Sequence, residues 1–127
     1  MRTKADFYVE NDKNELSWVG SLYDNGEPWN IPAEILIQVN PVMFEELTLD
    51  HLRKNKSAIA WEDRWPWEWP TSESTDYTYI LCADGNLIAY SSEEKTAFDP
   101  LMIAQGEDMH NARNFKIVVF PKMRKNA

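Results

Sequence analysis

Histidine, cysteine and carboxylate side chains are the groups of this chain that could carry out catalysis or hold a metal ion, and their spacing supports neither. His51 and His110, the only histidines, stand 59 residues apart with no second soft ligand near either, whereas a zinc site needs three or four such ligands. Cys82 lies inside a predicted central strand, where a thiol packs as a small hydrophobic group. Glu73 and Asp76 are the type of acid pair that glycosidases use, but chance pairs are common among 21 acidic residues. We therefore expect no enzyme, no metal site and no cofactor.

The tryptophan-rich segment 61–70, WEDRWPWEWP, holds four of the six tryptophans. Each tryptophan buries about 150–250 Å², so four represent about 600–1,000 Å², more than the apolar patch of about 300–600 Å² that a monomer exposes. We predict that the segment folds back over a sheet as a lid, with recognition at its margins. The expected binding residues are Trp61, Arg64, Trp65, Trp67, Trp69, Asp76 and Tyr77.

Length and composition predict a single domain over residues 1–127, because a chain of this size has room for one core. Hydrophobic residues make up 43% of the sequence, enough to offset the entropy lost on folding. No run reaches the roughly 20 apolar residues that span a bilayer, and the charged start MRTKADFYVENDKNE does not resemble a secretory signal. The single cysteine cannot form an internal disulfide, which favours a reducing compartment. We expect a cytoplasmic protein with no membrane association.

The net charge of −8 is unevenly distributed. Residues 57–112 contain eleven acidic and two basic residues, a balance of −9, whereas residues 113–127 contain five basic residues and no acidic one. An acidic surface repels nucleic acid and attracts basic partners. We therefore expect no direct nucleic-acid binding and a protein partner, either a host factor or a second copy of the chain.

Two hairpins are predicted from apolar runs that flank turn residues. Residues 5–10 and 16–23 are separated by NDKN, which favours an antiparallel pair. Residues 77–92 contain Asp84-Gly85, predicted to be a two-residue turn. That turn sets Cys82 opposite Leu87, Leu81 opposite Ile88, Ile80 opposite Ala89 and Tyr79 opposite Tyr90. Because these residues are apolar on both faces, the second hairpin is expected to lie centrally in its sheet.

One helix, or two short ones with a break at Thr48, is predicted over about 41–55. Asn40 can cap it and Pro41 is tolerated at its first position. Its expected buried stripe is Met43, Phe44, Leu47 and Leu52. Residues 33–38 stay ambiguous between a helical turn and a strand.

The run NFKIVVF over residues 114–120 predicts a last strand that ends at Pro121, followed by a basic tail, 122–127, that we expect to fray. The predicted order ββ-α-βββ is typical of an α+β fold. We expect a mostly antiparallel sheet with one helix or two short helices on one face, together with the tryptophan-rich lid loop.

Two stretches carry a family resemblance. ADFYV is followed by SWVGSLYDNGEP, and WPWEWPTSESTDYTY precedes the hairpin with the Asp-Gly turn. The motifs ADFYV, W-x-GS…DG and WPW-x-W…S-x-x-TDY-x-Y resemble those of a small uncharacterised protein family of bacteria, phages and mobile elements. The matching residues are Ala5–Val9, Trp18, Gly20, Ser21, Asp24, Gly26, Trp65–Trp67, Trp69, Ser74, Thr75, Asp76, Tyr77 and Tyr79. The resemblance covers about half of the chain and fades after Tyr90. It implies an accessory gene and no known activity.

Two functions are compatible with these features. The first is a non-enzymatic interaction protein, such as a phage or mobile-element accessory factor that binds and modulates a host protein. The second is a small-ligand-binding domain in which the tryptophan-rich segment stacks on a nucleotide or sugar ring. The acidic middle of the chain and the absence of a catalytic motif favour the first.

Overall fold

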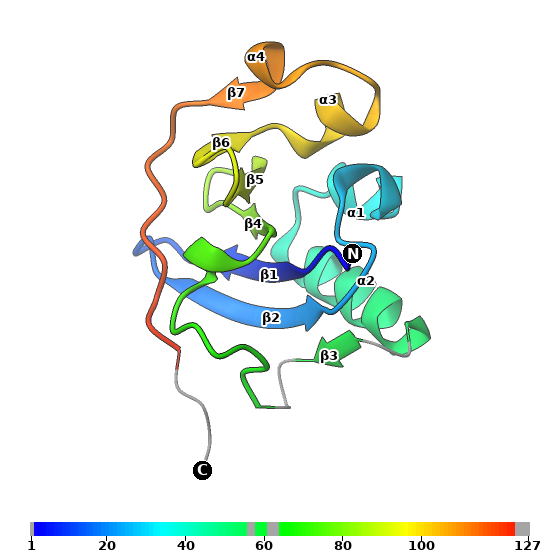
Figure 1. Cartoon of the computed structure of the whole chain (residues 1–127), viewed down its shortest axis with the longest axis vertical. Helices are drawn as coiled ribbons and strands as arrows, with labels where there is room; N and C mark the ends of the chain where they lie inside the picture. Colours follow the sequence, from blue (N-terminus) through cyan, green and yellow to red (C-terminus); the bar gives the residue numbers. More distant parts are fainter. Residues whose placement is uncertain (1, 56–57, 61–63, 124–127) are drawn as a thin grey trace.

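The computed structural model describes residues 2–55, 58–60 and 64–123. A seven-stranded sheet, in the order β3-β2-β1-β4-β5-β6-β7, forms the centre of this part of the chain (Figure 1). Its strands are β1 (Ala5–Glu10), β2 (Leu16–Leu22), β3 (Ala58–Ala60), β4 (Tyr77–Leu81), β5 (Leu87–Ser91), β6 (Thr96–Phe98) and β7 (Arg113–Asn114). All neighbouring strands are antiparallel except β1 and β4, which run parallel. The predicted α+β fold with a mostly antiparallel sheet is confirmed.

Helix α2 (Pro41–Lys54) is the longest helix and closely matches the predicted one. The Asn40 side chain accepts hydrogen bonds from the backbone N–H groups of Val42 (2.9 Å) and Met43 (3.1 Å), as expected of a cap. The helix continues through Thr48, so the alternative of two short helices with a break there is wrong. Met43 is 43% exposed, so its predicted place in the buried stripe is wrong.

The remaining helices are short. They are η1 (Pro28–Asn30), α1 (Ala33–Leu36), η2 (Ser72–Ser74), α3 (Pro100–Ala104) and α4 (Met109–Ala112). The ambiguous residues 33–38 therefore include a helical turn rather than a strand. In the described residues, no helix is long and apolar enough to cross a membrane.

The two faces of the sheet are covered differently. The helix-side core, which includes Phe7, Phe44 and Tyr79, packs against α1, α2 and α3. The lid-side cluster on the opposite face is smaller and is built around Tyr8, Ile80, Cys82, Ile88 and Ala97. Trp65 and Trp67 contact this second face, and Val118 and Phe120 pack on it, so the described part of the tryptophan-rich segment, residues 64–70, lies over the sheet as predicted.

The β4–β5 hairpin is central, as predicted, but its register differs from the prediction by one residue. Leu81 pairs with Leu87, and Ile80 pairs with Ile88. The reason is a three-residue loop in place of the two-residue turn. The Cys82 N–H donates to Asn86 O, the Gly85 N–H donates to Cys82 O, and Gly85 has a φ of +88°. A turn followed by a left-handed glycine is the usual form of a three-residue hairpin loop.

The predicted last strand, 114–120, is largely wrong. Only Arg113 and Asn114 pair, with Phe98 and Ala97 of β6, and β6 begins at Thr96. Because β6 has only one residue, Thr96, left to pair beyond Asn114, the chain leaves the sheet and crosses the lid-side face in an extended form. Figure 1 shows this orange-to-red segment on the side of the molecule away from α1 and α2. The Met123 N–H donates to Pro70 O at 2.6 Å, and the rest of the predicted frayed tail, 124–127, lies outside the described residues.

Candidate functional site

The tryptophan-rich segment is fixed to the sheet by its indole groups. Trp65 is 3% exposed, packs edge-on against Trp18 of β2 and donates its indole N–H to Trp69 O at 2.8 Å. Trp67, also 3% exposed, stacks on Trp69 and meets Tyr23 edge-on. Trp65 and Trp67 are therefore core residues, and Trp69 is half-buried.

Asp6 of β1 is the buried acceptor on which this segment converges. Its Oδ1 accepts hydrogen bonds from Ser21 Oγ (2.5 Å) and Trp67 Nε1 (2.7 Å). Its Oδ2 accepts from Ser72 Oγ (2.7 Å) and Thr75 Oγ1 (2.6 Å). Four donors fill the acceptor sites of a carboxylate, so the group has no vacant position for a ligand.

The hydroxyl groups around Asp6 extend the network outward. Ser21 Oγ accepts from Trp18 Nε1 (3.0 Å), and Thr75 Oγ1 accepts from Trp69 Nε1 (2.9 Å). Because Ser72 gives its hydrogen to Asp6, the Tyr8 hydroxyl, 2.7 Å away, must donate to Ser72 Oγ. Strand β2, the tryptophan-rich segment and the η2 turn, which are distant in sequence, are thereby all hydrogen-bonded to one carboxylate.

Burial raises the pKa of the Asp6 carboxyl above its ordinary value, although the four hydrogen bonds work in the opposite direction. Burial, together with the neighbouring Asp6 charge, also raises the pKa of the Tyr8 hydroxyl. A shifted carboxyl is often a sign of catalysis. Here the same residue is fully buried and its acceptor sites are filled by protein donors, so its role is to hold the lid.

The structure does not gather the sequence-predicted binding residues into one surface. Trp61 lies outside the described residues, and Arg64 is exposed. Asp76 is exposed and accepts a hydrogen bond from the Lys4 backbone N–H at 2.8 Å. Tyr77 is half-buried and packs against Phe98 in the helix-side core, on the other face from the lid.

The potential catalytic and metal-binding groups are also dispersed. Burial raises the pKa of the Cys82 thiol, with Lys116 only partly opposing it, so the thiol is not activated. His51 is half-buried on α2, and burial lowers its pKa. Across the part of the chain that the structure describes, no three His, Cys, Asp or Glu side chains form a group that could hold a metal ion.

Residues 113–120, which we call the strap, form the feature that sequence reasoning missed. Val118 and Phe120 point inward and pack on the lid-side cluster, and Phe120 meets Tyr90 edge-on. Phe115, Ile117 and Val119 are 87%, 86% and 81% exposed. This alternation follows from the twofold side-chain period of an extended chain. The signal in the sequence is that apolar residues occupy both odd and even positions of 114–120, so both faces of the extended segment are apolar. Its partner strand β6 has only three residues.

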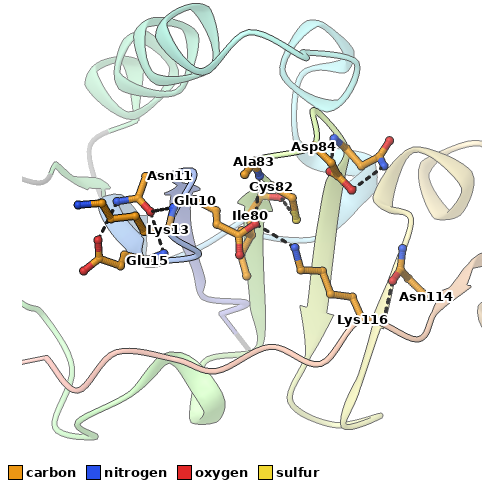
Figure 2. Close-up of polar contacts among 11 residues, drawn as sticks. Glu10, Asn11, Lys13, Glu15, Ile80, Cys82, Ala83, Asp84, Asn114 and Lys116 are labelled. Atoms are coloured by element: carbon orange, nitrogen blue, oxygen red, sulfur yellow. Dashed lines mark hydrogen bonds and ion pairs between the residues drawn. The ribbon is translucent and has the colours of Figure 1, made fainter.

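An ion pair anchors the strap to the sheet. Lys116 Nζ lies 2.9 Å from Glu10 Oε1, which also accepts from the Ala83 backbone N–H at 3.0 Å. Figure 2 shows Lys116 reaching from the strap toward Glu10, with Cys82 beside the contact. Burial raises the pKa of Glu10, but the Ala83 and Lys116 contacts outweigh it, so this pKa lies below its ordinary value.

The strap does not seal the face that it crosses. A cavity of about 320 Å³ remains between it and the sheet, next to the ion pair. The residues that line it are Glu10, Asn14, Leu16, Ile80 and Ile88 of the sheet side, and Lys116, Ile117, Val118 and Val119 of the strap. In the described chain, the backbone N–H groups of Phe115, Ile117 and Val119 donate no hydrogen bond.

A second group of exposed apolar residues lies at the junction of α1 and α2. Ile37, Val39 and Val42 are 60%, 68% and 64% exposed. Unlike the strap, these residues surround a helix start whose backbone is capped by Asn40. They provide matched control positions for experiments on the strap.

No family model, curated protein or solved structure matches the chain in the comparisons made with each. The resemblance to a family of bacteria, phages and mobile elements therefore stays a prediction.

Proposed function

We propose that this protein is a non-enzymatic interaction protein that binds another protein chain along the outward face of the strap. The observation that carries the proposal is the row formed by Phe115, Ile117 and Val119, each more than four-fifths exposed. Three side chains of this size expose on the order of 400 Å², as much as the largest apolar patch on a typical monomer, and such patches are often functional.

The backbone of the strap supports the same proposal. Its outward residues leave their N–H groups free of protein acceptors within the described chain. An extended segment with free backbone donors can bind a partner through main-chain hydrogen bonds while its side chains supply specificity. The strap is also held in place in advance by Lys116, Val118 and Phe120, so binding does not have to order it.

The tryptophan-rich segment is the weaker candidate for recognition. The rings of Trp65 and Trp67 are covered, and the indole N–H groups of Trp65, Trp67 and Trp69 are already used within the protein. Stacking of a nucleotide or sugar ring would depend on the half-buried Trp69 alone. That the partner is a host protein modulated by a mobile-element factor stays a prediction, based on the family resemblance.

Affinity capture with matched variants tests the proposal. Wild-type protein, Ile117→Lys and the control Ile37→Lys are immobilised and exposed to a bacterial lysate that also contains a differently tagged copy of the chain. We expect one specific protein, either the second copy or a lysate component, to be retained by the wild type and by Ile37→Lys and lost with Ile117→Lys.

Three results would contradict the proposal. Retention by Ile117→Lys and loss with Ile37→Lys would place recognition at the α1–α2 junction. Retention by both variants, but loss with Arg64→Ala or Trp69→Ala, would return it to the tryptophan-rich segment. Failure to retain any protein, the second copy included, at low and at high salt would remove the interaction function altogether.

A further inference from the structure

We propose that the partner of the strap is a second copy of this chain, bound about a twofold axis with the two straps antiparallel and their outward rows face to face, so that side chains rather than main-chain hydrogen bonds form the contact. This inference rests on the proposed function, because it names the occupant of the same surface. It requires a concentration-dependent dimer whose interface is centred on Ile117.

The pattern of the row is self-complementary. The apolar residues Phe115, Ile117 and Val119 are evenly spaced, and the only charged side chain among them, Lys116, points inward to Glu10. An antiparallel arrangement about Ile117 places each Phe115 against the partner's Val119 and the two Ile117 side chains against each other. Twofold interfaces are the commonest in homo-oligomers and need such a self-complementary patch.

The direction of the row fixes how two copies approach. Val118 and Phe120 point into the lid-side cluster, so the opposite face of the strap points away from the body of the protein. A second copy that presents its own row comes from the open side, and the two bodies lie on opposite sides of the paired straps. The helix-side core is not involved, so no part of the fold has to rearrange.

The area sets the expected strength. Each copy contributes on the order of 400 Å², or about 800 Å² in total, which is below the about 1,200–2,000 Å² of a stable interface. We therefore expect a weak, reversible dimer. Each copy also carries a net charge of −8, so the bodies repel and added salt strengthens the dimer by screening that repulsion. A heterologous partner held by opposite charge would bind more weakly as salt rises.

Sedimentation velocity over a range of protein and salt concentrations is the first test. We expect the mass to rise from 14.9 kDa toward twice that value as the protein concentration increases, and to rise further at high salt. Ile117→Lys should remain monomeric, because it places like charges across the axis, while Ile37→Lys should dimerise as the wild type does. Circular dichroism and tryptophan fluorescence confirm that each variant is folded.

Crosslinking tests the position of the axis. In a Cys82→Ala background, Ile117→Cys treated with a short bismaleimide should give a covalent dimer, and the control Val39→Cys, at a residue that is also largely exposed, should give none. A dimer that forms but crosslinks through Val39→Cys, or that survives Ile117→Lys, would overturn the inference.

The outcomes separate this inference from the proposed function. If the chain stays monomeric at every concentration and salt but retains another protein in a strap-dependent way, the proposed function stands and the second-copy inference fails. If the chain neither dimerises nor retains any protein, both fail. Dimerisation that Ile117→Lys abolishes supports both.

Discussion

Trp67 donates its indole N–H to Oδ1 of Asp6 at 2.7 Å, although 61 residues of chain separate them. Both side chains are buried, so the contact ties the lid to the central strand β1 away from water. A buried carboxylate with four donors is costly to disrupt, because removing it leaves those donors unpaired.

Asp6→Asn should lower the free energy of unfolding by about 2–4 kcal/mol, because the amide keeps the size of the side chain but places its own N–H groups against donors. Urea denaturation followed by tryptophan fluorescence measures the change. The control is Asp12→Asn, an exposed residue, with a change within about 0.5 kcal/mol. Equal effects of the two substitutions would show that Asp6 is not the anchor of the lid.

The stability difference between the wild type and Asp6→Asn should depend on pH. Because burial raises the folded-state pKa of Asp6 above its ordinary value of 3.8, this carboxyl binds its proton more tightly when folded. Its favourable contribution is complete below pH 3.8 and is lost as pH rises through the folded-state pKa. The wild type should therefore lose stability relative to Asp6→Asn in paired urea titrations over the window that opens as pH rises above 3.8. A relative gain over that window would mean that the hydrogen bonds lower the pKa more than burial raises it.

Substitution by alanine should destabilise the protein at one phenylalanine of the strap and have little effect at the other. Phe120→Ala should cost about 2 kcal/mol, since a half-buried ring leaves the lid-side cluster. Phe115→Ala should change stability by less than about 0.5 kcal/mol, because its ring is 87% exposed. Denaturation of dilute protein, where self-association is absent, makes the comparison. Similar losses would mean that the strap is turned differently.

The Lys116–Glu10 pair should show a favourable coupling of about 1 kcal/mol in a double-mutant cycle of Lys116→Met and Glu10→Gln. The value is modest because water screens the lysine, whose side chain is 35% exposed. The Glu10 pKa is lowered in the folded state, so its contribution is present above the ordinary pKa and is lost as pH falls through the folded-state value. A coupling near zero, or one that grows in acid, would contradict this role of the pair.

Sequence reasoning predicted the elements whose signals are local. Asn40 and Pro41 mark a helix start by backbone chemistry alone, and α2 begins there. The Asp84-Gly85 hairpin was also located correctly. Its register was not, because a two-residue and a three-residue loop use similar residues and a shift of one exchanges the faces of a strand.

The candidate site was harder to predict because it depends on long-range pairing. Phe115 and Val118 are equivalent by residue type in a run whose apolar residues fall on both faces of an extended chain, and only the short partner strand β6 decides that the strap leaves the sheet. Asp6 likewise lies within an ordinary strand sequence. Its importance appears only when Ser21, Trp67 and Thr75 meet in space.

Amide hydrogen exchange tests most directly whether the strap is the recognition surface. The backbone N–H groups of Phe115, Ile117 and Val119 should exchange rapidly in dilute protein, because they donate no hydrogen bond in the described chain, whereas Lys116 donates its own to Asn114 Oδ1 at 2.8 Å. Exchange there should slow when the partner binds, either a second copy at high protein concentration or the captured protein, while residues 64–70 remain unchanged. Slow exchange at Phe115, Ile117 and Val119 in the free protein, or protection that appears at residues 64–70 in their place, would contradict the account.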